Sequence, residues 1–214
     1  MPKKGEQWEA GLKYQPRGTE HLLTAAVYEI KELNRTTSLS AAQAADPAVT
    51  NPSGQVQDGE GTSKGVELEA QLAWHELDIY ASYAYIDAYV SQSNTLGEAG
   101  AALAAQPDHL ASIWATWRPA ALQHWQFGAG VRYVGETSDG TAYVEQNGAV
   151  LNNPLITVSY TLVDAMIGYE VGRYNLSLQA QNITDKTVIT SCLGRGDCFY
   201  GQRRAVSANL RYSF

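Results

Sequence analysis

The sequence predicts an all-β protein, an antiparallel meander of about nine long strands. Apolar and polar residues alternate with a period of two along most of the chain, which is typical of strands with one apolar and one polar face. Many of these segments reach about ten residues, whereas strands of soluble sheets usually have about five or six. Short and long connections alternate between them, so tight turns should gather at one end of the sheet and long loops at the other.

The alternation is clearest in four segments. In the first, Val66, Leu68 and Leu72 alternate with Glu67 and Glu69. The segments 125–133, 174–182 and 202–214 follow the same rule, but in 108–118 Trp114 is out of phase with its apolar neighbours, so the faces of that strand stay open. The nine expected strands cover residues 6–15, 21–36, 63–74, 77–91, 107–118, 123–135, 157–171, 174–184 and 202–214.

The connections and the aromatic residues indicate a membrane. The short connections are 17–19, 75–76, 119–122 and 172–173, and the long ones are 37–62, 92–106, 136–156 and 185–201. Tilted strands of about 9–11 residues span a bilayer core, and short turns opposite long loops are the layout of an outer-membrane β-barrel. Eight aromatic residues fall near the short turns, where we expect them to mark a membrane interface: Tyr14, Trp74, Trp117, Trp125, Tyr169, Tyr174, Tyr212 and Phe214.

Composition and motifs exclude several functions. The 214 residues carry a net charge of −7, which argues against a nucleic-acid partner because phosphate binding needs clustered lysine and arginine. No Gly-x-Ser-x-Gly motif, histidine cluster, phosphate loop or dinucleotide fingerprint occurs. We therefore predict no catalytic residue, no metal ligand and no cofactor, and we do not expect an enzyme.

The polar face favours a wide barrel. Charged and amide side chains such as Glu9, Lys13, Arg132 and Arg211 recur along it, more than the packed interior of a small eight-stranded barrel would hold. A wide barrel keeps a polar lumen or encloses a plug.

Seven short stretches, in order along the chain, carry a family resemblance. They are GEQWEAGLKY (5–14), SKGVELEA (63–70), SYAYIDA (82–88), GVRYVG (130–135), VDA (163–165), QNITDK (181–186) and YGQRR (200–204). With the terminal aromatic Phe214, the chain resembles the TonB-dependent receptors, in particular those that take up ferric siderophores.

The resemblance implies a 22-stranded transmembrane barrel with an N-terminal plug inside it, of which residues 1–214 would be the C-terminal portion. The plug, its TonB box and the earlier strands would then be missing, so we expect a fragment. The implied partners are outer-membrane lipid, the plug domain, the TonB complex acting through that plug, and the barrel assembly machinery at Phe214. A ferric siderophore would be the transported ligand, and the bacterial outer membrane the location.

The last long loop carries the remaining candidates. Cys192 and Cys198 flank five residues that include two glycines, and in an oxidising exterior we expect them to form a disulfide. Aromatic and cationic loop residues suit the flat, often anionic surface of a ferric siderophore, and five are candidate ligand contacts: Tyr143, Arg195, Phe199, Tyr200 and Arg203.

Two alternatives stay open. A complete small outer-membrane barrel of eight or ten strands, or a lipid-acting enzyme of that shape, requires the strands at 7–16 and 202–214 to pair. A soluble β-sandwich that acts as a binding module requires a second layer over the row Trp125, Phe127 and Val131.

Overall fold

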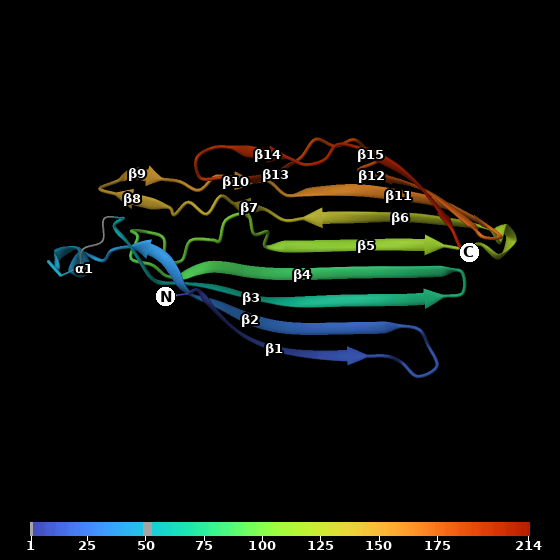
Figure 1. The fold of residues 1–214 in the computed structure, drawn as a ribbon, viewed down its shortest axis with the longest axis horizontal. Helices are drawn as coiled ribbons and strands as arrows, with labels where there is room; N and C mark the ends of the chain where they lie inside the picture. The colour runs from blue at the N-terminus through green and yellow to red at the C-terminus, as the bar shows by residue number, and fades with distance from the viewer. Residues whose placement is uncertain (1, 49–52) are drawn as a thin grey trace.

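The computed structural model describes residues 2–48 and 53–214, and its main feature is a nine-stranded antiparallel sheet (Figure 1). Each strand pairs with the neighbouring sheet strand of the sequence, which confirms the predicted all-β meander. The strands of this sheet, in order, are β1 (Lys4–Tyr14), β2 (Leu22–Ser38), β3 (Gln55–Trp74), β4 (Leu77–Gln92), β5 (His109–Trp117), β6 (Trp125–Val134), β11 (Tyr160–Val171), β12 (Tyr174–Gln181) and β15 (Ala205–Tyr212).

The long connections contain structure that the sequence pattern did not predict. Three two-stranded sheets lie there, together with the helix α1 (Ala41–Ala45), and the 3-10 helix η1 (Ala120–Leu122) forms one of the short turns. The small strands are β7 (Thr137–Ser138), β8 (Val144–Gln146), β9 (Ala149–Asn152), β10 (Ile156–Thr157), β13 (Ile189–Cys192) and β14 (Cys198–Tyr200). Figure 1 shows them, with α1, at the end opposite the short turns.

Four strand boundaries differ from prediction by three residues or more, and one of them is the start of β11, which lies at Tyr160 and not at 157. β3 begins at Gln55, eight residues before the predicted start, because its first residues pair with the end of β2 beyond a bulge at Asn34. β12 ends at Gln181 and β15 begins at Ala205, since Asn182 turns the chain out of the sheet with a φ of 50°.

One face of the sheet, here called the outer face, is apolar across all nine strands. Directly paired residues of an antiparallel sheet share a face, and the row through Leu68 continues to Ala25 on β2 and Tyr83 on β4. In the described part of the chain no Asp, Glu, Lys, Arg or His stands among the central outward positions of the sheet. The outward positions are the first residue and every second residue after it in the ranges 8–14, 23–27, 66–74, 77–85, 111–117, 125–133, 163–169, 174–180 and 206–212.

The aromatic residues near the short turns follow a slanted line. The strand pairing can be followed from Tyr14 across β2 and β3 to a residue of β4. That residue lies four positions farther from the short turn than the β4 residue that pairs with Trp74. Followed in the same way from Trp74 to β12, the pairing reaches a residue four positions farther from the short turn than Tyr174. Tyr174 itself pairs with Tyr212. The line thus descends about one residue per strand, which corresponds to a strand tilt of about 35°, within the range of membrane barrels.

Trp114, whose face the sequence left open, lies on the opposite, inner face. It pairs with Gly130, and its ring covers the positions where Gly128 and Gly130 have no side chain. The indole Nε1 donates a hydrogen bond to Thr116 Oγ1 at 3.0 Å. The two glycines therefore make the room that this large ring needs.

Neither alternative architecture is present in the residues that the structure describes. β1 pairs only with β2 and β15 only with β12, so the first and last strands do not close a small barrel. Trp125 and Val131 are 38% and 39% exposed, so no second layer covers that row. In the same described residues neither helical segment has the length or apolarity to cross a bilayer.

Candidate functional site

The four long connections meet in one cluster at the end of the sheet away from the short turns. Thr37 Oγ1, at the end of β2, lies 2.6 Å from Ser93 Oγ after β4. Asn94 Nδ2 donates to both carboxylate oxygens of Asp58 at 3.1 Å. These bonds join segments more than thirty residues apart, so the loops form one connected surface.

The two later loops join the same cluster. A Cβ added to Gly97 would lie 3.2 Å from the carbonyl oxygen of Tyr143, and one added to Gly194 would lie 2.8 Å from Thr141 Oγ1. The tip of the β13–β14 hairpin thus reaches the loop that carries Tyr143, and two of the regions predicted to contact ligand are brought together.

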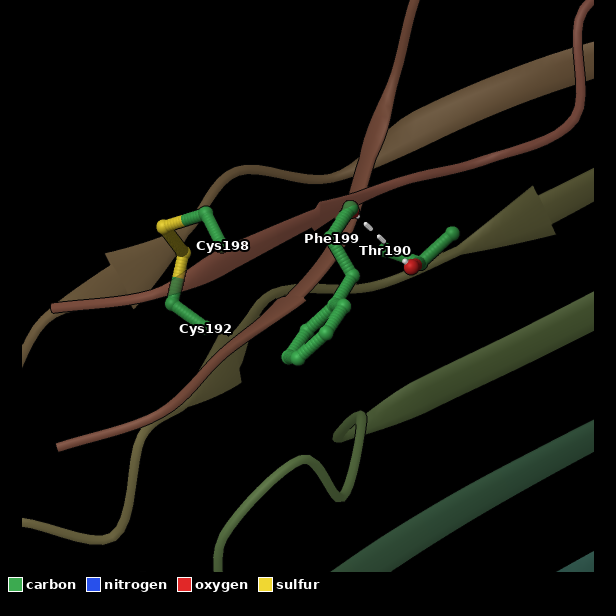
Figure 2. The surroundings of a disulfide bond; sticks show 4 residues. All are labelled: Thr190, Cys192, Cys198 and Phe199. Atoms are coloured by element: carbon green, nitrogen blue, oxygen red, sulfur yellow. Dashed lines mark hydrogen bonds between the residues drawn. A yellow bond between two sulfur atoms is a disulfide. The ribbon is translucent and has the colours of Figure 1, made fainter. Parts of the chain in front are cut away.

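The disulfide prediction is confirmed. Cys192 and Cys198 are joined across the β13–β14 hairpin, as Figure 2 shows. Next to the disulfide, Thr190 Oγ1 donates a hydrogen bond to the carbonyl oxygen of Phe199 at 3.1 Å. The hairpin is therefore fixed both covalently and by this bond.

The five candidate contact residues fall into two groups. The aromatic side chains of Tyr143, Phe199 and Tyr200 are 53%, 49% and 75% exposed on the loop cluster. Both guanidinium groups are already paired, Arg195 with Asp197 and Arg203 with Asp185. The loop surface therefore offers aromatic rings more freely than positive charge.

The base of the hairpin is held by Asn182, a residue whose role the sequence did not reveal. Its side chain is 2% exposed and is the largest fully buried one in the described chain. Nδ2 donates to the carbonyl oxygens of Lys186 at 2.8 Å and Gln202 at 3.2 Å, and Oδ1 accepts from Lys186 N at 2.9 Å. One carboxamide thus ties together the two ends of the excursion from 186 to 202.

Asn182 also connects the base of the hairpin to the inner face of the sheet. Asp164 on β11 accepts the backbone N–H of Asn182 at 2.8 Å and two hydrogen bonds from the Arg132 guanidinium, at 2.6 and 3.0 Å. Arg132 and Asp164 face the same side as Trp114, since Gly130 pairs with both Trp114 and Asp164. A polar recess of about 150 Å³ opens here, lined in part by Arg132, Asn182 and Arg203.

A second ion pair closes the base of the hairpin in the loop itself. Arg203 donates to Asp185 from Nε at 2.9 Å and from Nη2 at 2.6 Å, and Arg204 N donates at 3.0 Å. The Arg203 guanidinium is the main reason why the pKa of the Asp185 carboxyl is lowered to about 2. Asp185 therefore stays ionised over the physiological range.

An apolar cavity of about 380 Å³ lies between this hairpin and the segment that leads into β11. Its lining includes Ile156, Val158 and Val188 together with Lys186 and the disulfide cysteines. Such a cavity can hold an apolar group. Neither it nor the polar recess has a nucleophile paired with a base among its lining residues.

Comparisons with known proteins identify the family. Residues 1–183 match the family described as "TonB dependent receptor-like, beta-barrel". The ferrioxamine B receptor of Salmonella typhimurium is 33% identical over 222 residues, and the ferrichrome outer membrane transporter/phage receptor of Escherichia coli K12 is 32% identical over 225. Both alignments cover 100% of this chain, which spans 28% and 27% of the two relatives.

Solved structures show the same fold. The ferripyoverdine receptor of the Pseudomonas aeruginosa outer membrane superposes with a TM-score of 0.76 at 22% identity, covering 100% of this chain and 27% of the receptor. The ferric-catecholate import receptor Fiu of Escherichia coli K12 gives 0.72 at 23% identity, covering 100% and 28%. The chain therefore belongs to the TonB-dependent receptor β-barrel family, and its location is the bacterial outer membrane.

Proposed function

We propose that this chain forms part of the barrel wall of an outer-membrane receptor that takes up ferric siderophores with energy supplied through TonB. The observation that carries the proposal is the outer face: its apolar side chains run across nine strands and end at a slanted aromatic line. Such a surface fits a bilayer and leaves the polar inner face for a plug and a transported solute.

The relatives support the cargo. The proteins with 33% and 32% identity are named as receptors or transporters of ferrioxamine B and ferrichrome, which are both ferric siderophores. On this proposal the inner wall contacts a plug domain, TonB acts through that plug, and outer-membrane lipid covers the outer face. Phe214, which is fully exposed at the end of the chain, is the contact for the barrel assembly machinery.

A chimeric receptor tests the proposal. This chain replaces the matching segment of the Salmonella ferrioxamine B receptor, and the chimera is produced in iron-starved cells with and without TonB. We expect insertion into the outer membrane and TonB-dependent uptake of labelled iron from at least one ferric siderophore in a panel of hydroxamates and catecholates. A chimera that inserts correctly but imports none of them contradicts the proposal.

The same chimera tests the ligand contacts. Because Tyr143, Phe199 and Tyr200 have exposed rings, changing each to alanine should weaken siderophore binding by about two- to tenfold. Changing Arg195 or Arg203 to glutamine should act mainly on loop stability, since their guanidinium groups are paired with carboxylates. Binding titrations with ferric siderophore measure the first effect, and loop proteolysis measures the second.

A further inference from the structure

The tip of the β13–β14 hairpin carries an Arg-Gly-Asp sequence at residues 195–197, between the two disulfide cysteines. Every residue from 194 to 200 is exposed, and the side chains of Arg195 and Asp197 are 72% and 57% exposed. A Cβ added to Gly196 would have no atom within 4 Å, so the middle of the tip stands in open space. The tip therefore offers a guanidinium and a carboxylate to the same partner.

The backbone of the tip is held in one turn. Cys192 and Cys198 pair directly across the hairpin and are joined covalently. Inside this closure, Leu193 N donates to the carbonyl oxygen of Asp197 and Gly196 N donates to that of Leu193, both at 2.8 Å. Gly196 has a φ of 95°, which glycine adopts without strain. A turn closed in this way loses less conformational freedom on binding than an open loop of the same length.

In the unbound chain the two charged groups of the tip pair with each other. Arg195 Nε donates to the carboxylate of Asp197. Such an exposed ion pair contributes little to stability, because water solvates both groups when they separate. A partner that supplies a stronger counter-charge for each group can therefore separate them at small cost.

The chemistry of the tip specifies the partner that fits it. An exposed carboxylate can complete the oxygen shell of a divalent cation that the partner holds. The guanidinium can make a two-pronged contact with a carboxylate of the same partner. Gly196, between them, adds no side chain that would keep the partner away from the backbone. The complementary surface is therefore a protein with a metal site that has an open position and an acidic pocket beside it.

We propose that this tip binds a cell-surface adhesion protein that reads Arg-Gly-Asp through a bound divalent cation, with Asp197 on the cation and Arg195 in the acidic pocket. The hairpin lies at the end of the sheet that carries the long loops (Figure 1), and long loops face the exterior in outer-membrane barrels. The inference rests on this outward placement, which belongs to the proposed function, but it does not depend on the uptake of a siderophore.

The test uses the chimeric receptor in phosphatidylcholine nanodiscs and, as the probe, the soluble ectodomain of an Arg-Gly-Asp-binding integrin in a buffer with Mn²⁺. We expect saturable binding that EDTA or a cyclic Arg-Gly-Asp peptide abolishes. Asp197→Glu should weaken binding by about thirtyfold, as for a hot-spot residue, because the added methylene moves the carboxylate off the cation. Glu145→Asp, the converse change at an exposed carboxylate of β8, is the matched control and should bind like the wild type.

A second variant tests the closure of the tip. Cys192→Ser/Cys198→Ser keeps Arg195 and Asp197 but removes the covalent link, so binding should weaken by about tenfold through lost preorganisation. Hydrogen exchange across the hairpin is measured in parallel. It should stay unchanged in Asp197→Glu, because the backbone bonds of the turn do not use that carboxylate.

Each outcome decides the proposal. A wild-type chimera without saturable binding overturns it, as does equal binding by Asp197→Glu or binding that persists in EDTA. Loss of binding in Asp197→Glu together with faster exchange across the hairpin assigns the effect to folding and overturns the role given to the carboxylate. A chimera that binds the integrin but imports no siderophore refutes the proposed function and leaves this inference standing, and the reverse pattern refutes this inference alone.

Discussion

Asn182 shows how one side chain can fix a whole loop. Its φ of 50° lies in the left-handed region, which asparagine tolerates better than most residues, and its carboxamide serves both ends of the excursion from 186 to 202. The left-handed backbone conformation and the hydrogen bonds of the carboxamide are two distinct features of Asn182. Different substitutions can therefore separate their effects.

We predict that Asn182→Gly, which keeps the backbone conformation and removes the carboxamide, lowers the free energy of unfolding by about 1–3 kcal/mol, because buried backbone groups lose their partners. Hydrogen exchange in the β13–β14 hairpin should accelerate. Asn182→Ala should cost more because alanine adds backbone strain, and Asn175→Ala, at a half-buried asparagine of β12 whose amide donates to Glu170, is the control. Unchanged hydrogen exchange in the hairpin after Asn182→Gly would show that the Asn182 carboxamide does not hold the hairpin in place.

Asp185 predicts a pH dependence of the same loop. Its folded pKa of about 2 lies below the ordinary value of 3.8, so the interaction with Arg203 stabilises the fold fully above the unfolded pKa. That contribution is lost as the pH falls through about 2. Hydrogen exchange around 185–204 should therefore speed up between pH 4 and pH 2 in the wild type, and Asp185→Asn should remove this step. A step of equal size in the variant would assign it to another group.

At the scale of elements, the packing of β5 against β6 depends on Trp114 and the glycines opposite it. A Cβ at Gly128 would lie 2.5 Å from Trp114 Cζ2 and 3.2 Å from Met166 Cε, so every close atom belongs to a side chain. The conflict should therefore be reversible by a second mutation.

We predict that Gly128→Ala destabilises the folded barrel by about 1–3 kcal/mol through overpacking. Adding Trp114→Ala should make the alanine at 128 nearly neutral, so the two changes are non-additive in a double-mutant cycle measured by urea unfolding in detergent. Gly11→Ala, where the added Cβ meets a backbone carbonyl oxygen at 3.1 Å, is a comparison that Trp114→Ala should not affect. Additive effects at 128 and 114 would contradict this account.

The sequence predicted the long strands well because their period-two pattern extends over many residues. It missed β7 to β10, β13 and β14, since strands of two to four residues are too short to show a period. It left the faces of β5 open because Trp114 stands in the polar phase, and only the register shows that glycines make room for its ring. Asn182 stood within a stretch used for family resemblance, but its partners lie up to twenty residues away and no local pattern identifies them.

At the scale of the whole molecule, the outer face is the feature most open to a direct test. Leu68 stands in the middle of the apolar band and is 45% exposed, whereas Gln71 on the same strand faces inward with Thr24 and Ser82. We predict that Leu68→Arg costs about 2–4 kcal/mol of folding into lipid vesicles, because a charge at mid-depth is poorly solvated by hydrocarbon. Gln71→Arg should cost far less. Equal costs at both positions would mean that the band does not face lipid.

The candidate site was predictable in outline only. Loop position and residue type pointed to Tyr143, Phe199 and Tyr200, whose rings the structure leaves exposed. The same criteria selected Arg195 and Arg203, but their pairing with Asp197 and Asp185 depends on hairpin geometry, which residue type does not specify. Their contact with a ligand stays a prediction.

The meander order of the sheet has a kinetic consequence. Every strand pairs with the sheet strand that precedes it in sequence, so the sheet can grow by successive hairpins without distant encounters. The turn between β11 and β12 closes over two residues, whereas β12 and β15 are separated by more than twenty. Closure entropy rises only with the logarithm of loop length, but it favours the tight hairpins as early nuclei. The β11–β12 hairpin is therefore expected to form early, and the docking of β15, together with its disulfide-bonded loop, to complete the assembly.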